Sequence, residues 1–270
     1  MKSVLDVFPT TICVENLKDE ITNNEDLTRE FNIILERAFD IGYRRNNTCN
    51  FQSSTVKAFE EYNLPNLKNL FHRKVDEYAK GVLRYRYDES FFTQSWFCVN
   101  EPGNYFDIHN HPNNVISGVF FMRGEGDSGN LTFHKPYASI AQIQPDILFD
   151  PNNPRTFRTV VAPFVEYNLV LFPASLQHSV EKNLSKKNRV SFAFNSFIDT
   201  LGYEEGITEL KVTQRHLTNW PLNTLPAMVG CYCMWSYSNQ MTRLDKIIFV
   251  SSFVIFLNWG TRIFQQLVNF

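Results

Sequence analysis

Residues 189–197, Arg-Val-Ser-Phe-Ala-Phe-Asn-Ser-Phe, alternate between apolar side chains and polar or small ones. Successive side chains of a β-strand point to opposite faces of the sheet, so the valine and the first two phenylalanines share one face. Arg189, Ser191, Ala193 and Asn195 share the other face. The stretch therefore predicts a strand that has one apolar face and one face carrying an arginine and a serine.

Four further stretches have the same period of two, at residues 95–100, 115–122, 130–133 and 168–172. Turn-forming residues rich in glycine, proline and asparagine separate them, at residues 101–104, 124–129 and 151–154. Many short strands joined by such turns are typical of a sandwich or jelly roll. The sequence therefore predicts a mainly β protein with a jelly-roll core.

The two ends of the chain differ from this β-rich centre. Residues 5–15 are expected to form a short strand broken by Pro9, and residues 25–41 and 65–82 have the apolar spacing of helices. We therefore expect residues 1–85 to pack on a barrel formed by residues 86–200. Residues 201–270 form a C-terminal extension with an apolar helix at about 247–259. Three interpretations of this tail stay open: a buried or oligomer-forming helix, membrane contact, and disorder.

Composition excludes some classes of protein. The chain has 270 residues, of which 43% are hydrophobic and 20% charged, so it is long enough for one large domain with appendages. Its net charge of −2 gives no electrostatic reason to expect nucleic acid as a partner. The five cysteines are irregularly spaced, and the pair Cys231 and Cys233 has no matching second pair, which argues against a zinc knuckle. A reducing cytoplasm is the default expectation.

Three histidines have the spacing of a metal site. His109 and His111 are two residues apart and share a face if the chain is extended, and His178 follows a distant apolar run. Most non-haem iron sites use two histidines and one carboxylate, and here a histidine stands at the carboxylate position. We therefore rank His109, His111 and His178 first, and a set that contains Asp107 second.

Arg189 and Ser191 predict a binding site for a carboxylate. A guanidinium group binds a carboxylate through two parallel hydrogen bonds, and the serine adds a hydroxyl group on the same face. Arg189 comes eleven residues beyond His178, and this spacing favours a binding role over a surface arginine on an edge strand.

Residues 7–200 resemble the 2-oxoglutarate-Fe(II) oxygenases of bacteria and phage, within the prolyl-hydroxylase-like oxygenases. The resemblance rests on these segments: Phe8-Pro9-Thr10, residues 95–100, His109-Asn110-His111-Pro112, residues 117–121, residues 129–133, Leu171-Phe172-Pro173, His178-Ser179-Val180 and residues 189–195. It implies a double-stranded β-helix that uses Fe(II), 2-oxoglutarate and O₂.

The resemblance also implies roles for individual residues. The iron ligands fall on His109, His111 and His178, and the far carboxylate of 2-oxoglutarate falls on Arg189, assisted by Ser191. The weaker candidates for the pocket lining are Asn100, Tyr105 and Ser117. The implied reaction is hydroxylation with release of succinate and CO₂, in the cytoplasm of a bacterium or of an infected host cell.

Two rival interpretations stay open. Gly103 followed by His109 and His111 matches the first half of a cupin motif, but Val115 and Ile116 stand where a cupin has its glutamate. The other rival is a jelly-roll binding or structural protein without catalysis. The sequence leaves the substrate open between a small molecule and a protein side chain, and a homo-oligomer is a further expectation.

Overall fold

The computed structural model describes residues 9–40, 44–45, 51–53, 55–135, 158–202 and 210–212. The chain divides into two compact units, residues 1–214 and 215–270, and every described residue belongs to the first. The expected apolar helix at about 247–259 and the Cys231–Cys233 pair lie outside the described residues. None of the helices in the described ranges has the length and apolarity that a membrane crossing requires.

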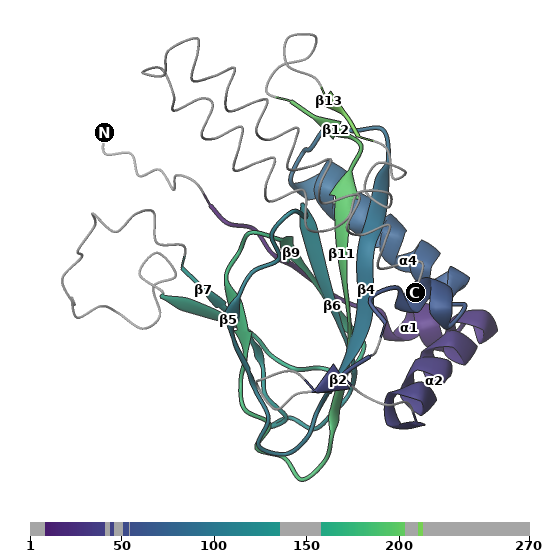
Figure 1. Cartoon of the computed structure of the whole chain (residues 1–270), viewed down its shortest axis with the longest axis vertical. Helices are drawn as coiled ribbons and strands as arrows, with labels where there is room; N and C mark the ends of the chain where they lie inside the picture. The colour runs from purple at the N-terminus through teal and green to yellow at the C-terminus, as the bar shows by residue number, and fades with distance from the viewer. Residues whose placement is uncertain are drawn as a thin grey trace, which may run out of the picture. The chain divides into compact units, whose positions relative to one another are not determined.

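Two antiparallel sheets form the centre of this unit (Figure 1). The large sheet has the strand order β1-β9-β6-β11-β4-β3-β2, and the small sheet has the order β5-β10-β7-β8. A separate hairpin pairs β12 with β13. The strands are β1 (Cys13–Asn16), β2 (Arg44–Arg45), β3 (Phe51–Gln52), β4 (Ser90–Asn100), β5 (Phe106–His109), β6 (Ile116–Arg123), β7 (Leu131–His134), β8 (Thr159–Ala162), β9 (Asn168–Pro173), β10 (His178–Val180), β11 (Arg189–Ile198), β12 (Thr200–Leu201) and β13 (Leu210–Lys211).

The expected mainly β architecture is confirmed. Each of the five stretches with a period of two contains a strand, namely β4, β6, β7, β9 and β11. The stretch at residues 5–15 contributes β1, which begins at Cys13 and pairs with β9. The sequence pattern did not indicate the remaining strands, each of which has four residues or fewer and so shows little of a period, namely β2, β3, β5, β8, β10, β12 and β13.

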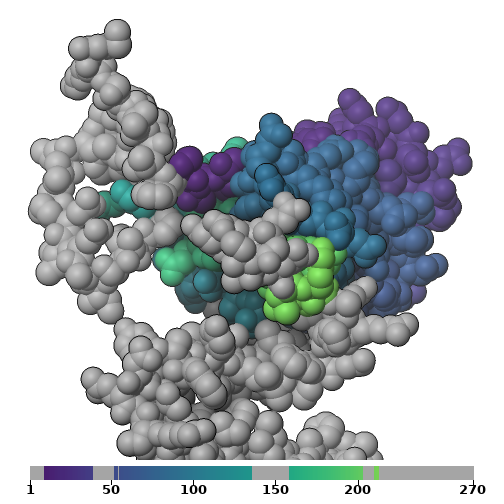
Figure 2. Space-filling model, turned by 90° about the horizontal axis from the view of Figure 1, so that it is seen from above, coloured from purple at the N-terminus to yellow at the C-terminus, as the bar shows by residue number. Residues whose placement is uncertain are grey.

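Helices of the N-terminal part cover one face of the large sheet (Figure 1). They are α1 (Lys18–Thr22), α2 (Glu25–Asp40), α3 (Ala58–Glu61), α4 (Pro65–Asp76) and the π-helical turn η1 (Glu77–Val82). Figure 2 shows this layer, coloured purple and blue, gathered on one side of the described residues. The two predicted helices are α2 and α4, and Pro65 begins α4, where a proline costs no hydrogen bond.

Strand β11 lies in the centre of the large sheet and is buried on both faces. It pairs with β4 on one side and β6 on the other. The ring of Phe194 stacks on Phe71 of α4, with 5.2 Å between the ring centroids, so the apolar face of β11 packs against the helices. Gly118 of β6 lies opposite Phe194, and a Cβ atom at this glycine would lie 2.2 Å from the phenylalanine ring. The other face of β11, which carries Arg189, is turned toward the space between the sheets.

Candidate functional site

Three histidine side chains converge at neighbouring strands of the small sheet. His109 ends β5 and His178 begins β10, and the two residues are paired across the antiparallel ladder. His111 lies two residues beyond β5, where its backbone N–H donates to the carbonyl oxygen of Ala174 at 2.9 Å. One ring nitrogen from each histidine lies within 4.8 Å of those of the other two. Three nitrogen atoms this close together could hold one metal ion.

Backbone hydrogen bonds orient two of these rings. Nδ1 of His109 lies 2.7 Å from the carbonyl oxygen of Asp107, and Nδ1 of His178 lies 2.9 Å from that of Leu176. A carbonyl oxygen only accepts, so Nδ1 carries the proton in both rings. The lone pair is then on Nε2, which is the atom left to bind a metal. In each ring, the hydrogen bond from Nδ1 to the backbone carbonyl oxygen also restrains the ring plane.

Burial keeps two of the histidines neutral. Loss of hydration and the nearby His109 lower the pKa of His111 to about 4. The same two causes, with smaller contributions from other neighbours, lower the pKa of His178 to about 3. Both rings are therefore uncharged at neutral pH, which is the form that binds a metal ion.

The histidines open into a cavity of about 300 Å³ between the two sheets. Its walls come from strands of both sheets, including the short β3, which lies between β4 and β2. The lining residues are Gln52, Trp96, Cys98, Asn100, Phe106, Asp107, His109, His111, Val119, Leu131, His178, Val180, Arg189, Ser191 and Ala193. The cavity thus brings the predicted metal ligands together with the predicted carboxylate-binding residues.

Arg189 is a buried cation with unused hydrogen-bond donors. Its side chain is 1% exposed, and its Nε and Nη1 atoms have no hydrogen-bond partner. Burial lowers its pKa to about 10, so the guanidinium still carries its charge at neutral pH. Ser191 is 4% exposed, lies on the same face of β11 and pairs with Cys98 across the sheet. A buried charge with free donors is a binding site for an anion of matching shape.

The weaker candidates lie in different surroundings. Asn100 lines the cavity, opposite Arg189 in the pairing of β4 with β11. Tyr105 is 45% exposed and is absent from the cavity wall. Ser117 is buried outside that wall, and its hydroxyl group donates to Oδ1 of Asn195 at 2.7 Å.

Asp107, the alternative metal ligand, lines the cavity but does not belong to the cluster of three ligand atoms. Its backbone carbonyl oxygen, rather than its carboxylate, lies 2.7 Å from Nδ1 of His109.

Sequence reasoning did not identify Cys98 and Gln52 as parts of the site. The alternation of residues 95–100 could have indicated Cys98, because antiparallel pairing places it beside Ser191. No sequence pattern indicates Gln52, which belongs to a two-residue strand next to the edge strand of the large sheet.

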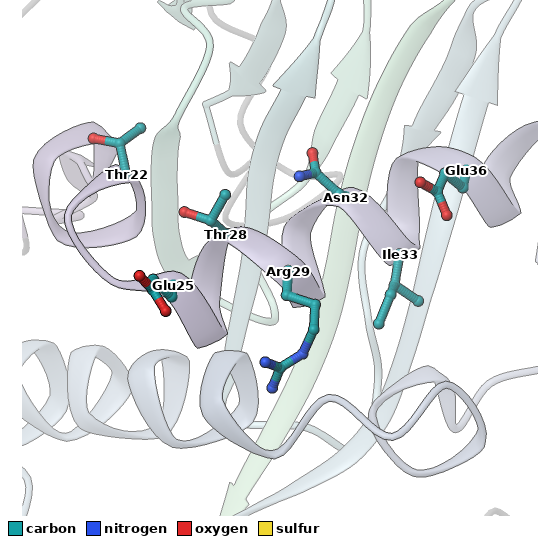
Figure 3. Close-up of a pocket in the computed structure, with 7 residues that line it drawn as sticks. All are labelled: Thr22, Glu25, Thr28, Arg29, Asn32, Ile33 and Glu36. Atoms are coloured by element: carbon teal, nitrogen blue, oxygen red, sulfur yellow. The ribbon is translucent and has the colours of Figure 1, made fainter.

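A second hollow, of about 550 Å³, runs along the outer side of α2 (Figure 3). Its lining residues are Thr22, Glu25, Thr28, Arg29, Asn32, Ile33 and Glu36. The labelled side chains point in different directions in Figure 3, and Arg29 is paired with Asp26 at 2.6 Å on the surface. The metal-ligand cluster lies in the other cavity, between the sheets.

Residues 94–195 match the sequence model of a family described as "Putative 2OG-Fe(II) oxygenase". This segment contains the three histidines, Arg189 and Ser191. The chain therefore carries a domain of the 2OG-Fe(II) oxygenases and is an enzyme of this class, with Fe(II), 2-oxoglutarate and O₂ as its cofactor and co-substrates. No curated protein matches the chain in sequence.

Solved structures with the same fold include two enzymes of nogalamycin biosynthesis. The epimerase SnoN, in complex with Fe3+, alpha ketoglutarate and nogalamycin RO, is 12% identical, with 76% of this chain and 91% of that chain covered and a TM-score of 0.50. The carbocyclase SnoK is 13% identical, with 78% and 87% covered and a TM-score of 0.50. A prolyl-4-hydroxylase of Pseudomonas putida is 11% identical, with 70% and 93% covered and a TM-score of 0.45. At 12–13% identity, the likeness to SnoN and SnoK establishes the fold alone.

Proposed function

We propose that His109, His111 and His178 hold one Fe(II), and that Arg189 with Ser191 binds the far carboxylate of 2-oxoglutarate in the same cavity. In this proposal the chain hydroxylates a small molecule or a protein side chain, and succinate and CO₂ are released. The observation that carries the proposal is the pair of unused donors on a buried arginine, in a cavity that also holds three converging histidines.

The residues fit this set of ligands in chemistry as well as in position. Nitrogen atoms of neutral imidazoles are suitable ligands for Fe(II). The guanidinium group can make two parallel hydrogen bonds to a carboxylate, and neither Nε nor Nη1 has another partner. The remaining walls are mainly apolar and include Val119, Leu131 and Ala193. An extended dicarboxylate could bind the metal with its 2-oxo acid end and accept hydrogen bonds from Arg189 with its far carboxylate.

The protein contributes binding, orientation and exclusion of water. The bonds from Nδ1 of His109 and His178 to backbone oxygens keep both rings turned toward the cluster. Arg189 and Ser191 fix the far end of the co-substrate, and this sets the position of its 2-oxo acid group. Iron and 2-oxoglutarate, when bound, supply the oxidising chemistry, and the apolar walls keep water away from it.

The test is a titration of the purified apoprotein with Fe(II) and then 2-oxoglutarate, without oxygen, while a visible charge-transfer band is recorded. The wild type is expected to give a band. His178→Ala should lose it, whereas His134→Ala, which changes a histidine outside the cavity wall, should keep it. Arg189→Ala should need far more 2-oxoglutarate, and Arg189→Lys should lie between, because lysine keeps the charge but not the paired donors.

Each other outcome favours a named alternative. Iron binding without a band that depends on 2-oxoglutarate would favour a cupin-type enzyme. A protein that binds no iron, and whose melting temperature does not change with added Fe(II), would favour a non-catalytic jelly-roll protein.

A further inference from the structure

Two phenylalanine rings flank the guanidinium group of Arg189. Phe121 belongs to β6, and Phe164 lies in the turn between β8 and β9. The Cζ atom of Arg189 lies 5.2 Å from the centroid of the Phe121 ring and 5.3 Å from that of Phe164. The two ring centroids are 4.9 Å apart, with 31° between the ring planes. The cation therefore packs against a pair of aromatic rings that do not belong to the cavity wall.

Hydrogen bonds alone leave this guanidinium loosely oriented. Two of its three nitrogen atoms have no partner, so they cannot fix its plane before a ligand arrives. A cation over the face of an aromatic ring is attracted by the ring's electrons, and the attraction grows when water is excluded. Both rings are buried, with Phe121 0% and Phe164 7% exposed. The ring pair thus supplies the orientation that hydrogen bonds do not.

Phe164 is itself held in place from two sides. Its backbone N–H donates to Oδ1 of Asn130 at 3.0 Å, and Nδ2 of Asn130 donates to Oε2 of Glu181 at 2.7 Å. Gly124 lets the ring approach the end of β6, because a Cβ atom there would lie 2.8 Å from two ring carbons of Phe164. These contacts restrain Phe164 although it lies outside a strand.

We propose that Phe121 and Phe164 form an aromatic clamp that positions Arg189, and that Phe164 is a positioning residue for recognition of the second carboxylate of the co-substrate. This inference rests on the proposed function of Arg189. Phe164 acts through Arg189 and lies outside the cavity wall. Its loss should weaken only those ligands that use the guanidinium group.

The experiment compares two 2-oxo acids in the anaerobic iron titration. One is 2-oxoglutarate, and the other is 2-oxobutyrate, which lacks the second carboxylate. Phe164→Leu should lower the affinity for 2-oxoglutarate about tenfold, which is the effect expected from the loss of a desolvated cation–ring contact. The affinities for Fe(II) and for 2-oxobutyrate should not change. Phe164→Tyr keeps the ring face and should restore the affinity for 2-oxoglutarate.

The matched control is Phe192→Leu, which removes a buried ring from the opposite face of the strand that carries Arg189. It should cost stability without changing the preference between the two acids. Gly124→Ala is a second test variant, since its methyl group would lie 2.8 Å from two ring carbons of Phe164, as well as 2.6 Å from Oγ of Ser128. It should reproduce the selective loss even if Phe164→Leu does not fold.

Two results would overturn the clamp. One is an unchanged affinity for 2-oxoglutarate in both Phe164→Leu and Gly124→Ala. The other is an equal loss for both acids, which would mean that the rings only support the fold. A wild type that gives no band at all would instead refute the proposed function, and the clamp with it.

Discussion

Replacing Arg189 with methionine should stabilise the ligand-free protein and, at the same time, lower its affinity for 2-oxoglutarate. Burial lowers the pKa of this arginine from its usual 12.5 to about 10. A change of this size corresponds to about 3 kcal/mol against the charged form. Methionine fills similar space without the charge, although the contacts with the two phenylalanine rings are lost, at about 1 kcal/mol. The free energy of unfolding should therefore stay equal or rise by up to about 2 kcal/mol.

The effect on ligand binding has the opposite sign. In the proposed complex, Nε and Nη1 of Arg189 become donors to a carboxylate. Removing one partner of a buried, hydrogen-bonded charge pair costs about 2–5 kcal/mol. The dissociation constant for 2-oxoglutarate should increase by roughly 30-fold to several thousand-fold. The affinity for Fe(II) should not change, because the cluster of possible metal ligands consists of the three histidines and does not include Arg189.

Urea unfolding of the apoprotein measures the first effect, and the anaerobic titration measures the second. Both need the same Arg189→Met preparation beside the wild type, in one buffer. A loss of more than 2 kcal/mol of stability, at an unchanged affinity for 2-oxoglutarate, would refute the reasoning. Arg189 would then be a structural residue, and its free donors would have no ligand.

Three further predictions concern other parts of the unit. Asp107→Asn should leave the Fe(II) affinity unchanged in a metal titration, because residue 107 contacts Nδ1 of His109 through its backbone carbonyl oxygen, which asparagine also has. A large loss of affinity would favour the alternative ligand set that contains Asp107. Gly118→Ala should destabilise the protein by about 1–3 kcal/mol in urea unfolding, because the new methyl group meets the ring of Phe194; an unchanged midpoint would contradict the packing. The apoprotein should lose stability as pH falls from about 6.5 toward 4. In this window His111 and His178 take up protons in the unfolded state, whereas in the folded state burial lowers their pKa values to about 4 and 3 and they stay neutral. A melting temperature independent of pH in this window would count against their burial.

The four central strands of the large sheet, β9, β6, β11 and β4, could be predicted because each is long enough to show its period. Strand β11 alternates over ten residues, from Arg189 to Ile198, and its two faces meet different surroundings as expected. The strands that carry the histidines were not predicted. Strand β5 has four residues and β10 has three, and their place depends on pairing with each other, which is a property of the tertiary fold.

The candidate site could best be predicted where two of its residues stand two positions apart in an extended segment. His109 and His111, or Arg189 and Ser191, share a face because they are two positions apart. Phe164 and Gln52 reach the site through contacts between distant segments, and no local pattern marks them. The buried state of Arg189 was equally hidden, since an arginine on a strand is more often exposed.

The charges of the site explain why the protein keeps groups that destabilise it when it is empty. In the proposed site, three neutral histidine ligands would leave the charge of Fe(II) uncompensated, and Arg189 adds a further positive charge in the same cavity. Among the described residues that line it, Asp107 carries the only carboxylate. A dianion such as 2-oxoglutarate offsets most of this positive charge and, at the same time, accepts hydrogen bonds from the unused donors of Arg189. A carboxylate in place of His111 would have lowered the charge without any co-substrate. The histidine therefore makes the site depend more strongly on the anion than a site with a carboxylate ligand would.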